Sequence, residues 1–386
     1  MINRAELKNF GPIEQLDWQN LGKINLIIGE NGCGKSFVLK ALYSAVRSLE
    51  EYKRGDNPES IEDILRVKLH WTFQAEKVGD LVHKKDKNPL SFDFILDEKS
   101  FHYSFGKDTT KIIHVKNETS PREDNSIYLP AKEVLSLFRI ILDSREHNKK
   151  FGFDDTYVDL ANALLKSSYV KDRLEFRIKS RLKKILGREY ELSDPAVLKK
   201  IMDAFLQSEL SKLDKELARE NSSESIKIFQ QCQQQLDQML GGKIEYDYED
   251  DRWHFRKGNQ KFSVGVMAEG IKKISILDTL LENGYLNEKS VVFIDEPESN
   301  LHPRAIAQLL DIIASLAQHG IQFFLASHSY FVVKKLFLIA QEQQMSIPVL
   351  SYQNGYWIQS DLKDDLPDNP IIDESIRLYE QQLDMD

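Results

Sequence analysis

The sequence predicts an α/β fold with an antiparallel β lobe and an inserted helical lobe. Three observations predict it. An apolar run at 23–28 is followed by a glycine-rich turn and an amphipathic stretch at 37–49, which is typical of a strand, a loop and a helix. A second apolar run, 291–294, ends in two carboxylates, and a third lies at 321–326. Continuous apolar strands of this kind are typical of parallel sheets that helices cover on both faces.

The glycine-rich turn carries the clearest chemistry. Residues 29–36 read GENGCGKS, a full match to the phosphate-binding pattern G-x-x-x-x-G-K-[ST] in its strand–loop–helix setting. Inward-pointing N–H groups and the helix N-terminus favour a triphosphate, so we expect the cofactors ATP and Mg²⁺. Lys35 is expected to reach the β- and γ-phosphates and Ser36 to ligate Mg²⁺. The residues expected to bind ATP are Gly29, Glu30, Asn31, Gly32, Cys33, Gly34, Lys35, Ser36 and Phe37.

Composition bounds the class of protein. The 386 residues are 41% hydrophobic and 29% charged, which is typical of a globular protein with a substantial core. No apolar run reaches the roughly 18 residues of a membrane span, and the N-terminus lacks a signal-peptide pattern. Cys33 and Cys232 indicate neither a disulfide framework nor a zinc site, so we expect a cytoplasmic location and no membrane partner. The net charge of −9 argues against binding polyanions through overall charge.

The first part of the chain is expected to hold half of the core and the β lobe. A hairpin is predicted over Ile2–Leu7, 9–13 and 15–18, leading into the phosphate-loop strand. Residues 50–60 are polar and expected to be exposed. Alternating aromatic or β-branched residues predict an antiparallel sheet with strands at 66–73, 91–96, 101–105 and 111–115. A returning strand at 126–130 and a helix at 131–142 are expected to follow.

Residues 157–240 are rich in Leu, Lys, Glu and Gln and predict the inserted helical lobe. Within it, 171–188 holds eight basic residues against two acidic ones. This stretch is either a solvated helix face or a docking surface for nucleic acid or an acidic partner. It lacks the interleaved aromatic residues that stack on bases.

The C-terminal part begins with short strands expected at 243–248, 252–255 and 261–264. Met267–Gly270 then opens an amphipathic helix at 271–281. Lys272 and Lys273 follow its glycine-bearing start, an arrangement that suits an anion but is common. Residues 371–383 predict a final helix, whose apolar stripe either packs on the core or binds a partner. The predicted organisation is 1–65 (first part of the core), 66–125 (β lobe), 126–156 (returning strand and helix), 157–240 (helical insertion) and 241–386 (second part of the core).

The second chemical signal is the run VVFIDEPE at 291–298. A buried parallel strand that ends in carboxylates places them at the ligand-bearing edge of the sheet. Asp295 is expected to hold the Mg²⁺ shell, and Glu296 to orient or deprotonate the attacking water. The next apolar strand, 321–326, ends in Ser327-His328-Ser329. His328 is either structural or a contact for the γ-phosphate or the water.

Four segments, GENGCGKS, MAEG, FIDEPESNLHP and ASHS in this order, resemble the ABC-type ATPase heads of the SMC, RecF and OLD-like group of AAA family ATPases. The resemblance implies a P-loop NTPase fold that dimerises around ATP. It implies Asp295 as the metal acid, Glu296 as the catalytic base and His328 as the switch histidine. Signature and D-loop positions fall on Ala268, Glu269, Gly270, Asn300 and His302. Lys132-Glu133 occupies the Q-loop place, without its Gln.

Two departures from the family pattern shape the functional expectation. Ala268 stands where the signature Ser contacts the partner's γ-phosphate, which implies slow hydrolysis. We expect no nuclease domain of the kind that OLD proteins carry after the ATPase, since 57 residues follow Ser329. The chain thus resembles stand-alone ATPase subunits of two-gene phage-defence systems such as Septu. We expect an ATPase that dimerises, with higher oligomers left open, and regulates a separate effector, expected to be a nuclease. The alternative is a RecF-like repair or recombination ATPase acting on DNA, and a transporter subunit is a third, weaker reading.

Overall fold

The centre of the protein is a six-stranded sheet in the order β14-β13-β3-β12-β11-β7. The computed structural model describes residues 1–55, 57–83, 88–111, 114–146, 151–165, 224–247, 250 and 252–384. Neighbours from β13 to β7 pair in parallel, and β14 is an antiparallel edge strand. The strands are β3 (Ile24–Ile28), β7 (Ser126–Leu129), β11 (Val291–Asp295), β12 (Gln322–Ser327), β13 (Pro348–Gln353) and β14 (Tyr356–Asp361). The predicted α/β class is confirmed.

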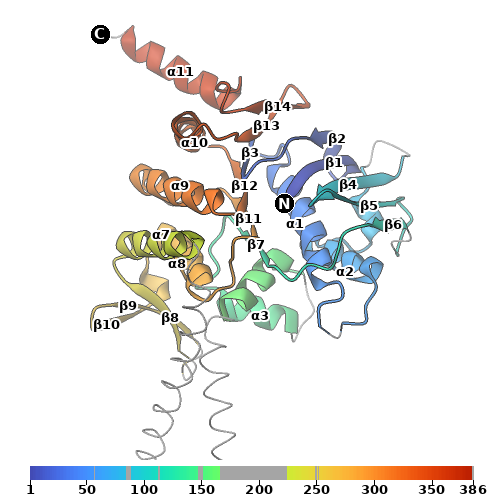
Figure 1. Cartoon of the computed structure of the whole chain (residues 1–386), viewed down its shortest axis with the longest axis horizontal. Helices are drawn as coiled ribbons and strands as arrows, with labels where there is room; N and C mark the ends of the chain where they lie inside the picture. Colours follow the sequence, from blue (N-terminus) through green and yellow to red (C-terminus); the bar gives the residue numbers. More distant parts are fainter. Residues whose placement is uncertain are drawn as a thin grey trace, which may run out of the picture.

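Helices cover both faces of this sheet (Figure 1). One face carries α1 (Lys35–Glu51) and, packed on it, α2 (Ile61–Phe73). The other carries α3 (Phe138–Glu146), α7 (Glu224–Leu240), α8 (Glu269–Glu282), α9 (Pro303–Gln318) and α10 (Tyr330–Gln343). Successive side chains of a strand point to opposite faces, so Leu26 belongs to the core under α8–α10 and Ile27 to the core under α1. This explains why the central strands are apolar throughout.

A five-stranded antiparallel sheet in the order β2-β1-β4-β5-β6 packs beside α1 and α2. Its strands are β1 (Ile2–Phe10), β2 (Ile13–Trp18), β4 (Leu90–Leu96), β5 (Lys99–Phe105) and β6 (His114–Asn117), with a short 3-10 turn, η1 (Val78–Leu81), before β4. The predicted hairpin of β1 and β2 is confirmed. Strand β1 of this hairpin pairs with β4. The antiparallel sheet therefore includes the N-terminal strands as well as the strands that follow α2.

The strand predicted at 66–73 is wrong, because these residues form the second half of α2. The Ser60 hydroxyl accepts the N–H of Asp63 and so caps the helix. Its buried positions recur at helical spacing, at Ile61, Ile64, Leu65, Lys68, Leu69 and Thr72. The β-branched and aromatic residues between them suggested a strand, but the cap and the buried face outweigh that local preference.

Two other expectations for this half need correction. Glu50, expected to be exposed, is fully buried, where it contacts Arg47, Arg122 and Ser126. The helix expected at 131–142 begins only at Phe138, since 131–137 form a loop after β7. That loop becomes part of the site described below.

The three strands expected after residue 242 are confirmed as β8 (Lys243–Asp247), β9 (Arg252–Lys257) and β10 (Gln260–Ser263), which form their own antiparallel sheet. A 3-10 turn, η2 (Val264–Val266), leads into α8. In the expected helical insertion, residues 155–165 are helical, and α7 forms its C-terminal end. The basic stretch at 171–188 lies outside the described residues.

The last helix, α11 (Pro370–Leu383), forms as predicted but projects from the body of the protein (Figure 1). Ile372 is 6% exposed, whereas Ile376, Tyr379 and Leu383 are 50–62% exposed. The expectation that the whole stripe packs on the core is therefore wrong, since only its first turn meets the core. Among the described residues, no helix has the length and apolar character needed to cross a bilayer.

Candidate functional site

The phosphate-binding loop lies between the end of β3 and the start of α1, as the motif predicts. Gly34, which caps α1, has φ of 103°, a left-handed conformation that favours glycine. A Cβ at this position would also lie 3.1 Å from Ile13 of β2. The loop therefore needs its last glycine for both conformation and space. Glu30 and Asn31 are exposed, and Cys33 is half-buried.

The Lys35 ammonium folds back over the loop. Its Nζ donates to the carbonyl oxygens of Gly29 and Glu30, each at 2.8 Å. The side chain is buried, so its charge stays beside the N–H groups that would hold phosphate oxygens. The Phe37 ring points elsewhere. It packs against Phe10 and Phe73, which leaves only the main chain of Phe37 for a nucleotide.

Ser36 and Asp295 meet although 259 positions separate them in the sequence. Burial raises the pKa of the Asp295 carboxyl above its usual range, while hydrogen bonds from Ser36 and Tyr128 oppose that rise. The Tyr128 hydroxyl donates to Oδ2 at 3.2 Å. A hydroxyl and a buried carboxylate at the phosphate loop are the oxygen donors that Mg²⁺ prefers. These two residues fit the metal, which would neutralise phosphate charge there.

Glu296 follows β11 in a left-handed conformation, with φ of 49°. Such a backbone is uncommon for residues other than glycine and is found where surrounding contacts hold it. The N–H of Glu296 donates to the carbonyl of Ala326 on β12, and the Nζ of Lys273 donates to the carbonyl of Glu296 at 2.6 Å. The side chain, about a third exposed, is thereby turned out from the end of the strand.

His328 lies at the end of β12 between two carboxylates. Its Nδ1 is 3.5 Å from Oε1 of Glu296 and 3.6 Å from Oε1 of Glu298. The same Glu298 oxygen accepts the Ser327 hydroxyl at 2.8 Å. The structure thus brings Asp295, Glu296 and His328 to one sheet edge beside the phosphate loop. Parallel neighbours share their carboxyl edge, which is why this grouping could be expected.

The segments expected to form the signature and the D-loop touch each other within the chain. Ala268 and Glu269 are exposed at the start of α8, while Gly270 is buried. A Cβ on Gly270 would lie 2.4 Å from the carbonyl oxygen of Asn300, so this contact requires glycine. His302 caps α9, because its Nδ1 accepts the N–H of Arg304 at 3.2 Å.

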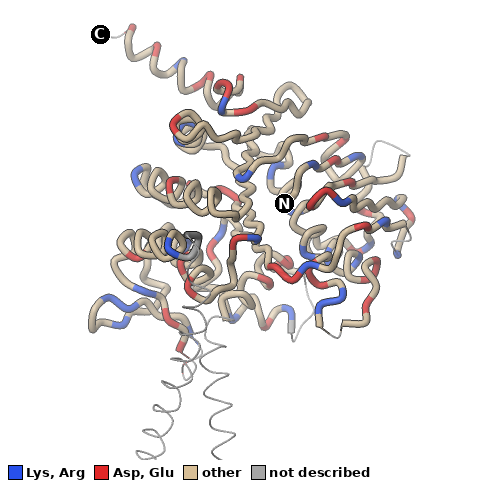
Figure 2. The backbone as a smooth tube through the Cα atoms, viewed as in Figure 1, with Lys and Arg blue, Asp and Glu red and all other residues tan. Residues whose placement is uncertain are grey.

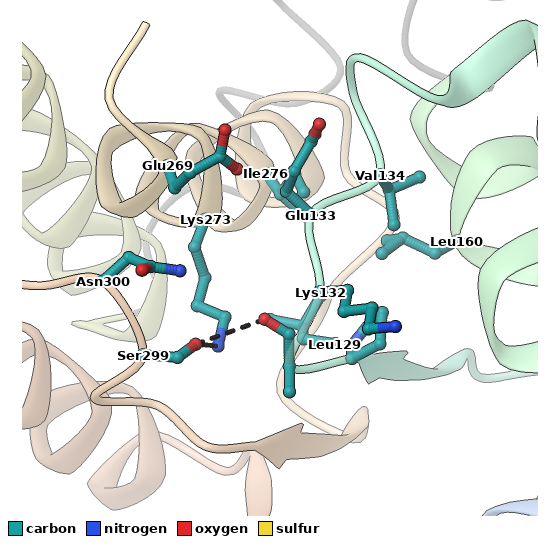
Figure 3. Close-up of a pocket in the computed structure, with 12 residues that line it drawn as sticks. Leu129, Lys132, Glu133, Val134, Leu160, Glu269, Lys273, Ile276, Ser299 and Asn300 are labelled. Atoms are coloured by element: carbon teal, nitrogen blue, oxygen red, sulfur yellow. Dashed lines mark hydrogen bonds between the residues drawn. The ribbon is translucent and has the colours of Figure 1, made fainter.

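A cavity opens between the loop after β7, the start of α8 and residues 299–300 (Figure 3). Its lining includes Leu129, Glu133, Glu269, Lys273, Ser299 and Asn300, and no residue of the phosphate loop. Glu133, at the expected Q-loop place, lies 3.5 Å from the Nζ of Lys272. Lys272 and Lys273 both point inward to acceptors of this chain, so their ammonium groups do not face an anion at the start of α8.

A buried ionic network fixes the outer face of α1. Lys40 pairs with Asp154 at 2.7 Å, and the Tyr43 hydroxyl donates to Asp159 at 2.6 Å. Lys68 of α2 lies within 3.2 Å of Glu51, Asp155 and Asp159. These contacts hold the phosphate-loop helix against residues 154–159. Elsewhere, positive and negative positions are intermingled along the described backbone (Figure 2).

Two aromatic side chains border the other side of the loop. Tyr352 of β13 and Trp357 of β14 are cross-strand partners with ring centroids 4.9 Å apart. The Cβ of Tyr352 lies 3.2 Å from the point where a Cβ on Gly29 would be. For Gly34 the nearest atom of Trp357 is at 4.0 Å. The sequence interpretation missed this hairpin, although its alternating pattern around Asn354-Gly355 indicates a hairpin.

A second group of possible metal ligands lies at the β8–β9 turn. Single ligand atoms of Asp247, Asp250 and His254 lie within 4.8 Å of one another. The ammonium of Lys261 already contacts Asp247, so part of the negative charge is compensated by the protein itself. None of its residues belongs to the nucleotide motifs.

Comparison with known proteins identifies a similar sequence and similar solved structures. A relative from Methanocaldococcus jannaschii, the uncharacterized protein MJECL10, is 30% identical over 141 residues, which are 34% of this chain and 62% of that protein. The matched part is thus less than two thirds of the relative's length. Two solved structures are similar over most of their length. The Smc head domain of Pyrococcus furiosus bound to the C-terminal domain of ScpA has a TM-score of 0.45 at 14% identity, covering 98% of each chain. The recombination mediator protein RecF has a TM-score of 0.43 at 16% identity, covering 93% of this chain and 98% of that one.

The family match spans the site from end to end. Residues 24–334 match the family described as "AAA domain, putative AbiEii toxin, Type IV TA system". The matched range begins with β3 and ends beyond His328, so it includes the phosphate loop, the start of α8, the carboxylate-bearing turn after β11 and the turn with His328 after β12. The chain therefore belongs to this AAA domain family.

Proposed function

We propose that this protein is an ATPase that binds ATP with Mg²⁺, dimerises around it and hydrolyses it slowly. The observation that carries the proposal is the meeting of Ser36 and Asp295 at a complete phosphate loop. Lys35 would hold the β- and γ-phosphates, and Ser36 and Asp295 would hold the metal. Glu296, turned out beside His328, would orient or deprotonate the attacking water.

The dimer is proposed from the exposed start of α8. Ala268 and Glu269 face solvent there, so they are available to a nucleotide bound by a second copy. Alanine offers no hydroxyl to a γ-phosphate. The contact would therefore rely on the helix N-terminus alone, which supports slow turnover.

We further propose that nucleotide binding regulates a separate effector, a nuclease, in bacterial phage defence. The family description names a toxin and a toxin–antitoxin system, which fits a component that acts with another polypeptide. In the described residues, the carboxylates that could serve a metal-dependent nuclease are those of the nucleotide site and the Asp247 group. The alternative, direct action on DNA, rests on the basic residues at 171–188, which lie outside the described part.

Glu296→Gln tests the ATPase. The amide cannot act as a base, so ATP and Mg²⁺ should remain bound while turnover falls about 100-fold or more. Dimers should then accumulate with ATP, as measured by light scattering. Glu342→Gln, the same change at an exposed site on α10, is the matched control and should hydrolyse ATP normally. Lys35→Ala should lose ATP binding altogether, and normal hydrolysis by Glu296→Gln would contradict the assignment of the base.

A second experiment tests the effector. The purified chain, given ATP with Mg²⁺ or Mn²⁺, should leave plasmid, single-stranded DNA and RNA intact. Cleavage that persists in Lys35→Ala and follows the protein through purification would contradict a purely regulatory role. DNA binding without cleavage, falling steeply with salt, would support the alternative.

A further inference from the structure

Lys273 is a buried lysine whose partners are main-chain carbonyls of the catalytic turn. Its Nζ lies 3.2 Å from the carbonyl oxygen of Asp295, 2.6 Å from that of Glu296 and 2.8 Å from the Ser299 hydroxyl. Figure 3 shows the side chain reaching from α8 across the cavity to Ser299. The ammonium has three N–H donors, and three acceptors meet it. No other described contact joins α8 to the carbonyl of Glu296.

The turn after β11 is built around this ammonium. The carbonyl of Glu296 also accepts the N–H of Ser299 at 3.0 Å, and the Ser299 hydroxyl donates to Ala131 at 3.2 Å. Glu296 has a left-handed φ, and its carbonyl and that of Asp295 both accept from Lys273 of α8. Without the ammonium, the carbonyls of Asp295 and Glu296 would each lose a hydrogen bond, and only the N–H of Ser299 would remain on that of Glu296, which is unfavourable. The lysine thus stabilises the backbone conformation that turns the Glu296 side chain outward.

The start of α8 touches the same segment at a second point. Gly270 lies against the backbone of Asn300, and Lys273, three positions later, lies on the same face of the helix. Two contacts a helical turn apart fix both the distance and the direction between α8 and residues 295–300. These contacts connect the exposed start of α8 to the backbone of Glu296.

We propose that Lys273 is a positioning residue that couples the start of α8 to Glu296 of the same chain. This inference rests on the proposed function. A nucleotide bound by a second copy would contact Ala268 and Glu269 of this chain. That contact would then set the position of Glu296 in this chain. Each subunit would thus hydrolyse its own ATP in response to the nucleotide of its partner.

Lys272 provides a matched control. It is equally part of α8 and equally buried, but its Nζ contacts the side chains of Glu133, Ser136 and Glu269 rather than the turn after β11. Lys273→Met and Lys272→Met each remove one buried ammonium and keep the length of the side chain. A general loss of stability should be similar in the two variants. A difference between them in the exchange or activity of the turn that carries Glu296 therefore reports the coupling between α8 and that turn.

The first measurement is hydrogen exchange of the nucleotide-free protein, which needs no turnover. In Lys273→Met the amides of peptides covering 295–301 should exchange about 10-fold faster, because their turn has lost its central donor. In Lys272→Met they should exchange as in the wild type. Equal exchange in both variants would overturn the proposal.

The second measurement is kinetic. Lys273→Met should lower kcat about 10-fold or more, since a misplaced catalytic group costs that much, while the Kd for ATP stays within about 2-fold. Lys273→Met in a Glu296→Gln background should cause no further loss, because both changes act on one group. A full additional loss would show that Lys273 acts elsewhere and would overturn the proposal.

Two safeguards keep the result interpretable. If Lys273→Met does not fold, Ser299→Ala removes one acceptor and should lower kcat by about 3-fold in the same non-additive way. A wild-type protein without ATP hydrolysis would refute the proposed function and this inference together. An active wild type with normal kcat in Lys273→Met would refute only the inference.

Discussion

The main-chain N–H of His328 donates to Oε1 of Glu298 across 3.1 Å, and the imidazole Nδ1 lies 3.6 Å from the same oxygen. Ser327 donates its hydroxyl to this oxygen as well. One carboxylate on the turn after β11 therefore fixes the loop after β12. The third acid of the run at 295–298 is thus a support for the histidine, and it is 9% exposed.

Glu298→Ala should lower kcat about 10-fold with little change in ATP affinity, because His328 loses the acceptor that orients it. Glu298→Gln should retain most activity, since its amide oxygen can accept the same two hydrogen bonds. Steady-state kinetics with a separate measurement of ATP binding distinguish the outcomes. If Glu298→Gln lowered kcat as much as Glu298→Ala, the negative charge of Glu298 would be what supports activity, rather than its role as a hydrogen-bond acceptor.

Trp357 should contact the nucleoside end of ATP. Asp295 and His328 lie on β11 and β12, on one side of β3, and would face the γ-phosphate, whereas β13 and β14 lie on the other side. A nucleotide with its phosphates on the loop would then extend its base toward Tyr352 and Trp357. Trp357→Ala should weaken ATP binding about 10-fold, which corresponds to the binding free energy typical of one stacked base. It should leave the binding of inorganic tripolyphosphate unchanged.

Calorimetry with both ligands measures this difference. Tyr356→Ala is the control, because Tyr356 is on the same strand but 73% exposed. An equal loss of ATP and tripolyphosphate binding in Trp357→Ala would show that the ring only supports the loop.

Asp159→Asn should destabilise the protein by about 1–3 kcal/mol, because Lys68 and Arg47 each lose one buried carboxylate partner and keep their other acidic partners. Burial favours the neutral acid, but Lys68, Arg47 and the Tyr43 hydroxyl outweigh it and hold the pKa of Asp159 below its usual value. Its stabilising effect is therefore present above the unfolded pKa of about 3.9 and lost as the pH falls through the folded pKa. Urea unfolding measures the effect. Asp311→Asn, which removes a surface pair with Lys335, should cost at most about 1 kcal/mol.

Asp278→Asn should stabilise the protein more at pH 8 than at pH 5. Burial raises the pKa of Asp278 to about 7, with Asp237 and Glu282 adding to the rise and Lys243 opposing it. Above pH 7 the folded state must hold this carboxylate ionised, which costs about 2 kcal/mol relative to the unfolded chain. As the pH falls from 7 toward the unfolded pKa of about 3.9, the folded carboxyl is protonated while the unfolded one is still ionised, so the cost decreases steadily and disappears only below that value. Thermal melts at the two pH values test this, and equal shifts at both would contradict it.

The position of the phosphate-loop motif and of Asp295 at one sheet edge could be predicted because each motif is a pattern of neighbours in sequence. The phosphate loop needs its glycines, Lys35 and Ser36 at fixed spacing. A parallel strand that ends in Asp295 places this residue at the carboxyl edge of the sheet. Lys273 could not be identified in this way. Its acceptors are main-chain atoms more than 20 positions away, and any residue type supplies a carbonyl.

Burial was harder to predict than secondary structure. The stripe of α11 has correct helical spacing, but spacing does not reveal whether a surface lies opposite it. The same limit applies to Glu50, whose charge suggested exposure although Arg47 and Arg122 compensate it inside the protein. The error at α2 had a local cause, since the Ser60 cap was not weighed against the β-branched residues that follow.

The central sheet separates two cores that share five of its six strands, β3, β7, β11, β12 and β13. Leu26 and Ile27 are adjacent in β3 yet pack into different cores, and Val292 and Phe293 of β11 divide in the same way. Neither core can melt alone, because losing one exposes the strands that the other needs. The described halves should thus form a single cooperative unit, in which calorimetric and van't Hoff enthalpies agree.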